Sequence, residues 1–133
     1  PSAVVLEGGT HNPFAPPFPF VEHAFAPLLR RIGFRLGLTL ERSGFYPNGG
    51  GRCRVALEAA GALSALHLGN ENLEVPAPRS ATAVVAGLPK HVGERELLRV
   101  CDRLGVSPSQ ARVEMPSDTL GPGNTLHVFL GAD

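Results

Sequence analysis

The segment from Gly8 to Pro19 restricts the local structure of this chain more than any other. It contains prolines at positions 13, 16, 17 and 19, and each proline fixes φ and removes a backbone donor. Neither a helix nor a strand runs easily through such a segment, so the sequence predicts a loop over residues 8–19. This loop must join two separate elements with a stiff backbone.

Both neighbours of the loop have periodic patterns. The valine-rich run Ser2–Leu6 precedes it and predicts a buried strand. A helix is predicted from Phe20 to Gly33, with Pro27 expected to bend it because proline removes an amide donor and crowds the preceding turn. The apolar residues that share one face of this helix are Val21, Phe25, Leu28, Leu29 and Ile32.

The remaining pattern predicts short strands and one more helix. Alternation at Leu36, Leu38 and Leu40 predicts a strand with one buried face. The order of elements indicates an α+β fold of mixed sheets with helices packed on one face, and residues 70–80 are the expected connection between two parts. Further strands are predicted at 52–59, 63–68, 81–86, 110–114 and 125–130, and a helix at 91–104.

Composition excludes several classes of protein. Twelve basic residues balance twelve acidic ones, so any polyanion must be met by a local patch rather than by a global field. No apolar run is long enough to span a membrane, and no membrane partner is expected. Cys53 and Cys101 are interpreted as reduced thiols of a cytoplasmic protein. The chain starts at Pro1 and has Met115 as its single methionine, so we expect it to be a piece of a longer polypeptide.

The proline-rich loop is the first candidate binding site. Thr10, His11 and Asn12 offer hydrogen-bonding groups, while Pro16 and Pro17 offer flat apolar surface for an aromatic base. The loop also leads into a helix N-terminus, where free amides favour an anionic group. The alternative interpretation is a stiff connector without a ligand.

The turn that contains Gly49, Gly50 and Gly51 is the second candidate. Between residues 30 and 54 lie six arginines and one glutamate, a local charge of +5. Arg42, Arg52 and Arg54 could therefore hold RNA phosphates, with Phe45 and Tyr46 stacking on bases. No Lys-Ser or Lys-Thr follows the glycines, so the turn is not a Walker loop. The alternative is a hairpin turn with solvated arginines.

No catalytic group or metal site is predicted from the residues alone. The chain has five histidines, with no pair at the spacing of metal ligands. The GxSxG, HExxH and kinase signatures are also missing. The residues by themselves therefore indicate an α+β domain with a nucleotide or RNA surface. The histidines are His11, His23, His67, His91 and His127.

Four short motifs resemble the RNA 3′-terminal phosphate cyclase family, and together they extend over almost the whole chain. They are Gly8–Pro17 (GGTHNPFAPP), Gly44–Gly51 (GFYPNGGG), Ala86–His91 (AGLPKH) and Gly121–Thr125 (GPGNT). The chain departs from the family pattern at Ser43, where Arg or His is usual, at Cys53, where an aliphatic residue is usual, and at Pro19, where Asp is common.

The resemblance implies an ATP-dependent enzyme that converts an RNA 3′-phosphate into a 2′,3′-cyclic phosphodiester. In such enzymes a histidine takes AMP from ATP and passes it to the RNA phosphate, and the neighbouring 2′-OH then displaces AMP. A divalent ion, Mg or Mn, offsets the triphosphate charge. The partners implied are ATP, RNA with a 3′-phosphate end and the remaining parts of the same polypeptide.

Carried over by residue, the resemblance places the adenine against Pro17, with Thr10, His11, Asn12 and Pro16 as further candidates for the ATP site. It assigns residues 1–79 to part of a large domain and 80–133 to an insert domain that is expected to be incomplete. The catalytic histidine is expected beyond Asp133, so this segment contains no catalytic residue and no metal ligand, and it is expected to be inactive alone.

Two other functions stay open. One is a non-catalytic cyclase-like protein that binds RNA during ribosome assembly, against which the intact Ala15-Pro16-Pro17 argues. The other is a free-standing binding module, against which an unpaired sheet edge argues.

Overall fold

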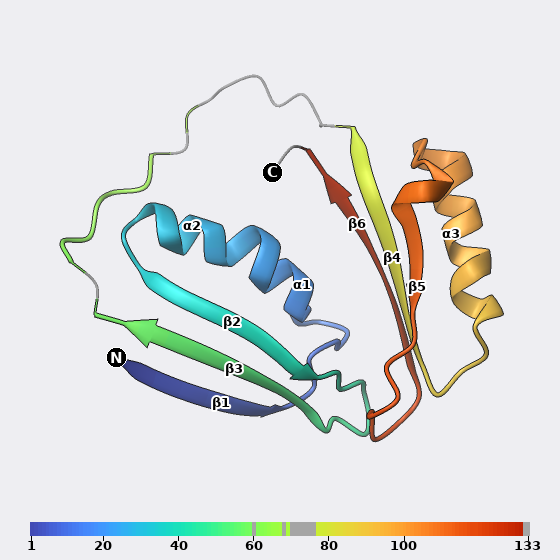
Figure 1. The fold of residues 1–133 in the computed structure, drawn as a ribbon, viewed down its shortest axis with the longest axis horizontal. Coiled ribbons are helices and arrows are strands. Elements are labelled where there is room, and N and C mark those ends of the chain that lie inside the picture. The colour runs from blue at the N-terminus through green and yellow to red at the C-terminus, as the bar shows by residue number, and fades with distance from the viewer. Residues whose placement is uncertain (60, 68, 70–76, 132–133) are drawn as a thin grey trace. The chain divides into compact units, whose positions relative to one another are not determined.

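The computed structural model describes residues 1–59, 61–67, 69 and 77–131. They divide into two compact units, Pro1–Gly69 with Asp118–Leu120, and Asn70–Ser117 with Gly121–Asp133. Each unit combines a three-stranded sheet with helix (Figure 1), so the predicted α+β class is confirmed. The assignment of 1–79 and 80–133 to two domains of a larger fold stays a prediction.

The first unit is an antiparallel sheet with a helical segment on one face (Figure 1). The strand order β1-β3-β2 places β3 in the middle, so β1 and β2 run parallel to each other without touching. The elements are β1 (Ser2–Gly8), α1 (Phe18–Phe20), η1 (Val21–Phe25), α2 (Ala26–Arg31), β2 (Arg35–Arg42) and β3 (Gly51–Glu58).

The irregularity expected at Pro27 takes the form of a π-helical turn. Segment η1 is π-helical, and the amide of Ala26 donates to the carbonyl of Val21. Pro27 lacks the amide that a regular α-helix would use one residue later. A wider turn just before the proline accommodates that missing donor, and α2 continues afterwards as an ordinary helix.

The alternation predicted for the second strand is confirmed. Leu36, Leu38 and Leu40 are half-buried, whereas their neighbours along β2 are exposed. Cα partners across the strands share a face, so Leu40 lies beside Cys53 and Leu38 beside Val55. One face of this sheet is therefore apolar and helix-covered, while the other is polar.

The strand predicted at 63–68 is wrong over its described residues. Residues 63–67 have no regular structure. The amide of Ser64 donates instead to the carbonyl of Ile32 at 3.0 Å, and its hydroxyl donates to the carbonyl of Arg31. These bonds hold the segment against the end of α2 rather than against the edge of a strand. Residue 68 lies outside the described residues.

The second unit packs one long helix on a mixed sheet (Figure 1). Strand β4 is central, parallel to β5 and antiparallel to β6. The core of the second unit consists of Ala81, Ala83, Leu97 and Val106. The elements are β4 (Pro78–Ala86), α3 (His91–Leu104), η2 (Pro108–Gln110), β5 (Ala111–Glu114) and β6 (Gly123–Leu130).

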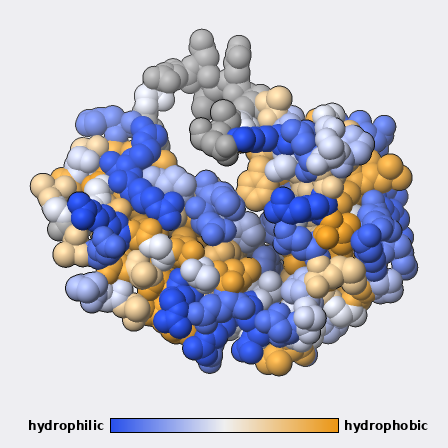
Figure 2. Space-filling view, in the orientation of Figure 1, coloured by the Kyte–Doolittle hydropathy of each residue, from blue (hydrophilic) through white to orange (hydrophobic). Residues whose placement is uncertain are grey.

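Helix α3 has the predicted bounds. Gly105 follows it with a φ of 71° and donates its amide to the carbonyl of Cys101, which is the left-handed C-terminal cap that glycine favours. Across the described part of the chain, no helix combines the length and apolar character needed to cross a membrane. Apolar surface is nevertheless visible on both units (Figure 2). The strand predicted at Ser2–Leu6 is present, but the expectation that it is buried is wrong. Its apolar residues Val4, Val5 and Leu6 are exposed on the edge strand β1.

Candidate functional site

The two predicted site loops meet at Thr10 and Gly44. The amides of Thr10 and His11 both donate to the carbonyl of Gly44, at 2.9 and 3.0 Å. In return the amide of Gly44 donates to the hydroxyl Oγ1 of Thr10 at 2.9 Å. Backbone and side chain together therefore fix the proline-rich loop to the glycine turn.

His11 is buried in this junction, with 7 % of its surface exposed. Its ring stacks on Phe45, with 5.1 Å between the ring centroids and 22° between the planes. Its Nδ1 lies 2.8 Å from Thr10 Oγ1. The Thr10 hydroxyl also donates to the carbonyl of Gly44 at 3.4 Å. The prediction that Phe45 stacks on a base is therefore wrong, because Phe45 is buried and its partner is His11. Tyr46 stays exposed.

Glycines at the junction are required by close backbone approach. A Cβ on Gly44 would overlap the backbone nitrogen of Gly51 and lie 2.5 Å from the carbonyl oxygen of Gly8. A Cβ on Gly51 would lie 2.6 Å from Cγ2 of Thr10. Gly49 and Gly50 have φ values of 64° and 71°, which only glycine adopts freely. The protein's own packing thus accounts for these glycines.

The proline-rich segment forms a closed loop. The amide of Phe18 donates to the carbonyl of Thr10 at 2.9 Å, so the two ends are joined. Phe14 is fully exposed and has a φ of 68°, an uncommon conformation for a non-glycine residue. Pro16 is exposed and Pro17 half-buried. The side chain of Asn12 packs against Gly9, and its buried Oδ1 lacks a hydrogen-bond partner among the described residues.

The expectation of free amides at the helix start is wrong. The amide of Phe18 is bonded to Thr10, and the amides of Phe20 and Val21 donate to the carbonyl of Pro17 at 3.0 and 3.2 Å. Pro19 has no amide proton. Residues 18–21, all of them described, therefore have no donor left for an anion, because the loop closure and the Pro17 carbonyl take every amide.

Arg52 and Arg54 are engaged in a surface ion-pair network on the polar face of the first sheet. Arg52 donates to Glu41 Oε2 at 2.7 Å and to Glu7 Oε1 at 2.6 Å, and Arg54 donates to Glu41 Oε1 at 2.7 Å. Two arginines and two glutamates make this cluster neutral. Sequence reasoning missed Glu7 because it lies far from the turn in the chain, and only the pairing of β1 with β3 brings it beside Arg52.

The network shifts the ionisation of its members. Hydrogen bonds from Arg52 and Arg54 lower the pKa of Glu41, because they stabilise the carboxylate. The bonds to Glu41 and Glu7 raise the pKa of Arg52. Arg42, the third predicted RNA contact, lies at the end of β2 and donates Nε to the carbonyl of Gly50 at 2.5 Å. Contact of these arginines and glycines with RNA stays a prediction.

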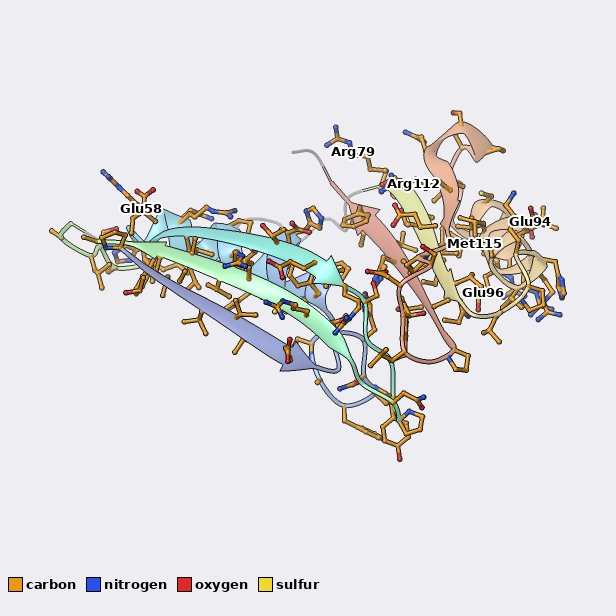
Figure 3. The ribbon with its side chains drawn as sticks, turned by 60° about the horizontal axis from the view of Figure 1, so that its bottom comes forward. Glu58, Arg79, Glu94, Glu96, Arg112 and Met115 are labelled. Carbon is orange, nitrogen blue, oxygen red and sulfur yellow. The ribbon has the colours of Figure 1, made fainter. Side chains whose placement is uncertain are left out.

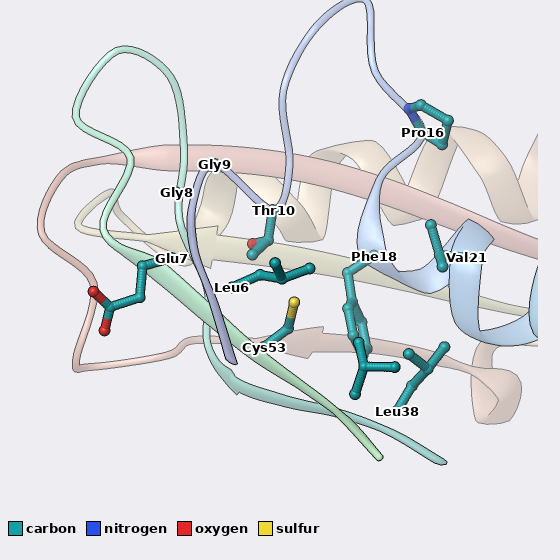
Figure 4. A pocket seen from close by; sticks show the side chains of 11 residues that line it. Leu6, Glu7, Gly8, Gly9, Thr10, Pro16, Phe18, Val21, Leu38 and Cys53 are labelled. Carbon is teal, nitrogen blue, oxygen red and sulfur yellow. The ribbon is translucent and has the colours of Figure 1, made fainter. Parts of the chain in front are cut away.

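An open apolar recess of about 240 Å³ lies on the helix-covered face of this sheet. Figure 4 shows Cys53 at its floor and Phe18 and Leu38 along one side, with the carboxylate of Glu7 pointing away. Burial, and then the charge of Glu41, raise the pKa of the Cys53 thiol. Pro16 and Thr10 also line the recess, so the proline-rich loop borders an apolar cavity. Sequence reasoning did not find this recess, because its lining comes from four separate segments.

A polar recess of similar size, about 240 Å³, occurs in the second unit. Arg79 and Arg112 both line it, and Figure 3 shows them at the same end of the unit. Arg112 donates Nε to Glu114 at 2.7 Å, which offsets part of its charge. None of the sequence motifs indicated a site at this position.

The described residues include no group of three His, Cys, Asp or Glu side chains placed to hold a metal ion. Of the predicted ATP-site residues, the structure brings Thr10 and His11 into the junction and Pro16 to the rim of the apolar recess. Pro17 starts the helix beside them.

Comparison with known proteins identifies the family. The family described as RNA 3′-terminal phosphate cyclase matches residues 1–126. The protein of that name from Koribacter versatilis is 43% identical over 128 residues, which are 96% of this chain and 36% of the relative. The corresponding protein from Ectopseudomonas mendocina is 48% identical over 130 residues, 95% of this chain and 36% of the relative. A third, from Pseudomonas fluorescens, is 44% identical over 126 residues, 95% of this chain and 36% of the relative.

The chain is thus an α+β protein whose loops carry the motifs of an RNA-processing enzyme family. It belongs to the RNA 3′-terminal phosphate cyclase family. It spans about a third of the length of the curated relatives it matches.

Proposed function

We propose that this chain is the part of an ATP-dependent RNA 3′-terminal phosphate cyclase that contributes the wall of the adenine site and most of an insert domain. The observation that carries the proposal is the family match over residues 1–126, which includes both of the loops that meet at Thr10 and Gly44. Because the relatives are much longer, the catalytic histidine and the phosphate-binding groups are assigned to the rest of the polypeptide.

In the proposed reaction, a histidine outside this chain attacks the α-phosphorus of ATP and releases pyrophosphate. An oxygen of the RNA 3′-phosphate then displaces the histidine, which gives an RNA-adenylate. The 2′-OH attacks the 3′-phosphorus, loses its proton and expels AMP, and the cyclic phosphodiester results. AMP is a better leaving group than an oxygen of the unactivated phosphate, so adenylylation makes ring closure possible.

The residues of this chain fit the base of a nucleotide better than its phosphates. Pro17 is half-buried at the start of the helix, beside a recess lined by apolar side chains such as Phe18 and Val21. A flat apolar ring there suits an aromatic base. The helix-start amides are occupied and Arg52 is paired with glutamates. A divalent ion would offset triphosphate charge, and its ligands are assigned outside this segment.

The same comparison supports a role for RNA as the partner. We propose Arg42, Arg52 and Arg54, together with the turn Gly49–Gly51, as the surface nearest to the RNA. In this proposal, RNA phosphates would replace the carboxylates of Glu7 and Glu41 as partners of the guanidiniums of Arg52 and Arg54. Such exchange keeps the net contribution of each contact small and sensitive to salt. A cytoplasmic location fits two reduced cysteines.

The test is covalent adduct formation by the full-length protein. Incubated with ATP and magnesium, the protein should gain the mass of one AMP, and RNA with a 3′-phosphate should remove it while RNA with a 3′-OH should not. A folded protein that gains no adduct, yet binds RNA, would instead support the non-catalytic cyclase-like function. Pro17→Gly should weaken ATP binding without unfolding the protein, and unchanged affinity would remove Pro17 from the site.

A further inference from the structure

We propose that Thr10 is a positioning residue for the nucleotide site, one that sets where Pro16 and Pro17 lie without itself touching the nucleotide. The inference rests on the proposed function, because only that function gives the prolines a ligand. It goes beyond it by assigning to one hydroxyl the task of holding the base-facing loop in place.

Thr10 uses all of its polar groups to close the loop on itself and on the sheet. Its carbonyl accepts the amide of Phe18, its amide donates to the carbonyl of Gly44, and its Oγ1 accepts the amide of Gly44. The hydroxyl also contacts Nδ1 of His11 at 2.8 Å. Thr10 thus joins the two ends of the proline-rich loop and connects both to the second loop.

The two branches of the Thr10 side chain have separate tasks. Its Cγ2 methyl packs at the Cα of Gly51, since a Cβ added there would lie 2.6 Å away. Its Oγ1 satisfies the Gly44 amide, which is otherwise enclosed by backbone. Thr10→Val keeps the methyl shape and removes the hydroxyl, whereas Thr10→Ser keeps the hydroxyl and removes the methyl. The pair separates hydrogen bonding from packing.

The stiffness of the loop transmits any change at Thr10 to the prolines. Pro13, Pro16 and Pro17 have fixed φ values, so the loop has few bonds about which to adjust. Phe14 is held at a φ of 68°, a strained conformation that persists only when its surroundings enforce it. Without the Thr10 hydroxyl the Gly44 amide loses its acceptor, and only backbone bonds hold the loop against this strain. We expect the rings of Pro16 and Pro17 then to move as a unit.

The experiment compares ATP with inorganic tripolyphosphate as ligands of full-length wild type, Thr10→Val and Thr10→Ser. Displacement of the prolines removes the base contact only. If the binding-competent loop falls to about a tenth of the population, the Kd for ATP rises about tenfold. We expect that loss for Thr10→Val, near-wild-type ATP affinity for Thr10→Ser, and unchanged tripolyphosphate affinity for both. In turnover, KM for ATP should rise while kcat stays close to wild type.

Two matched variants separate the possible failures. Thr39→Val makes the same chemical change at an exposed position of β2 and should alter neither affinity. Pro17→Gly tests the base wall itself. If Pro17→Gly weakens ATP binding but Thr10→Val does not, the positioning role is refuted and the proposed function stands. If neither weakens ATP binding, the adenine wall fails. Equal loss of ATP and tripolyphosphate affinity in Thr10→Val would show a general structural defect and overturn the assignment.

Hydrogen exchange in wild type keeps the proposal testable should Thr10→Val not fold. The amides of Thr10, His11, Phe18 and Gly44 should already be protected without ATP, because the loop closure is preformed. Fast exchange of these amides in the ATP-free protein would mean that the loop is not held, and would refute the positioning role.

Discussion

Gly44 and Gly51 lie in direct backbone contact, and the chain has no space for a side chain between them. One follows β2 and the other begins β3, so the turn that joins the two strands closes tightly on itself. Gly8 contributes a third backbone segment to the same place. The glycines of this turn thus support the structure directly.

Gly44→Ala should destabilise the protein by more than about 2 kcal/mol, because the new methyl meets backbone atoms that cannot turn aside. Denaturant unfolding of the full-length protein measures the change. Gly61→Ala is the matched control, since a Cβ at Gly61 would meet nothing within 4 Å. Equal stability of the two variants would contradict the tight junction.

Gly93 should be similarly intolerant in the second unit. A Cβ there would lie 2.8 Å from Cγ2 of Val85 and 3.1 Å from Cβ of Ala83, where α3 approaches β4. Alanine normally stabilises a helix relative to glycine by up to about 1 kcal/mol, but overpacking should reverse the sign and cost about 1–3 kcal/mol. The measurement is thermal unfolding, with the exposed Arg99→Ala on the same helix as a control. A higher melting temperature for Gly93→Ala would refute the close packing.

Glu41→Gln should strengthen the binding of RNA at low salt. The substitution frees both arginines from the shared carboxylate and changes the local cluster from neutral to +1. We expect the slope of log affinity against log salt to steepen by about 0.7 for each further phosphate of single-stranded RNA that an arginine neutralises.

Glu58→Gln makes the same charge change at the end of β3, outside the network formed by Glu7, Glu41, Arg52 and Arg54. Filter binding of a single-stranded RNA across a salt series distinguishes the two variants. Identical behaviour would show that total charge matters and that the pairing of Arg52 and Arg54 does not.

The carboxylate of Glu41 should make the free energy of unfolding depend on pH in the acid range. Since arginine hydrogen bonds lower the pKa of Glu41 in the folded chain, the unfolded chain binds the proton more readily. The stabilising contribution of ionised Glu41 is complete above the ordinary pKa of 4.5, and it is lost as the pH falls through the lowered pKa of the folded chain. The stability difference between wild type and Glu41→Gln should therefore shrink below pH 4.5. A difference that stays constant in acid would contradict the pairing.

Local patterns predicted most of the fold. Helix α3 has a clear amphipathic period and a glycine cap at Gly105, so both of its ends could be located. The β2 alternation was equally clear. The strand predicted at 63–68 fails because a favourable local pattern forms a strand only where a partner edge is present, and Ser64 bonds to the end of α2 instead.

The site was less accessible to sequence reasoning. The residue types of the two loops indicated a nucleotide or RNA surface, but no local pattern shows that Thr10 and Gly44 bind each other. Likewise, the sum of +5 for residues 30–54 did not include Glu7. The pairing of β1 with β3 brings Glu7 beside Arg52. Long-range interactions thus occupy donors and charges that sequence reasoning left free for ligands.

The strand order β1-β3-β2 has a consequence for the chain while the ribosome is still synthesising it. Within this described sheet, β1 and β2 each pair with β3, which is made last. During synthesis from the N-terminus, β1 and the helix that follows it must emerge and wait for that partner. Neither strand has its β3 partner until residues 51–58 leave the exit tunnel. The exposed valines of β1 are therefore most open to wrong pairing during that interval.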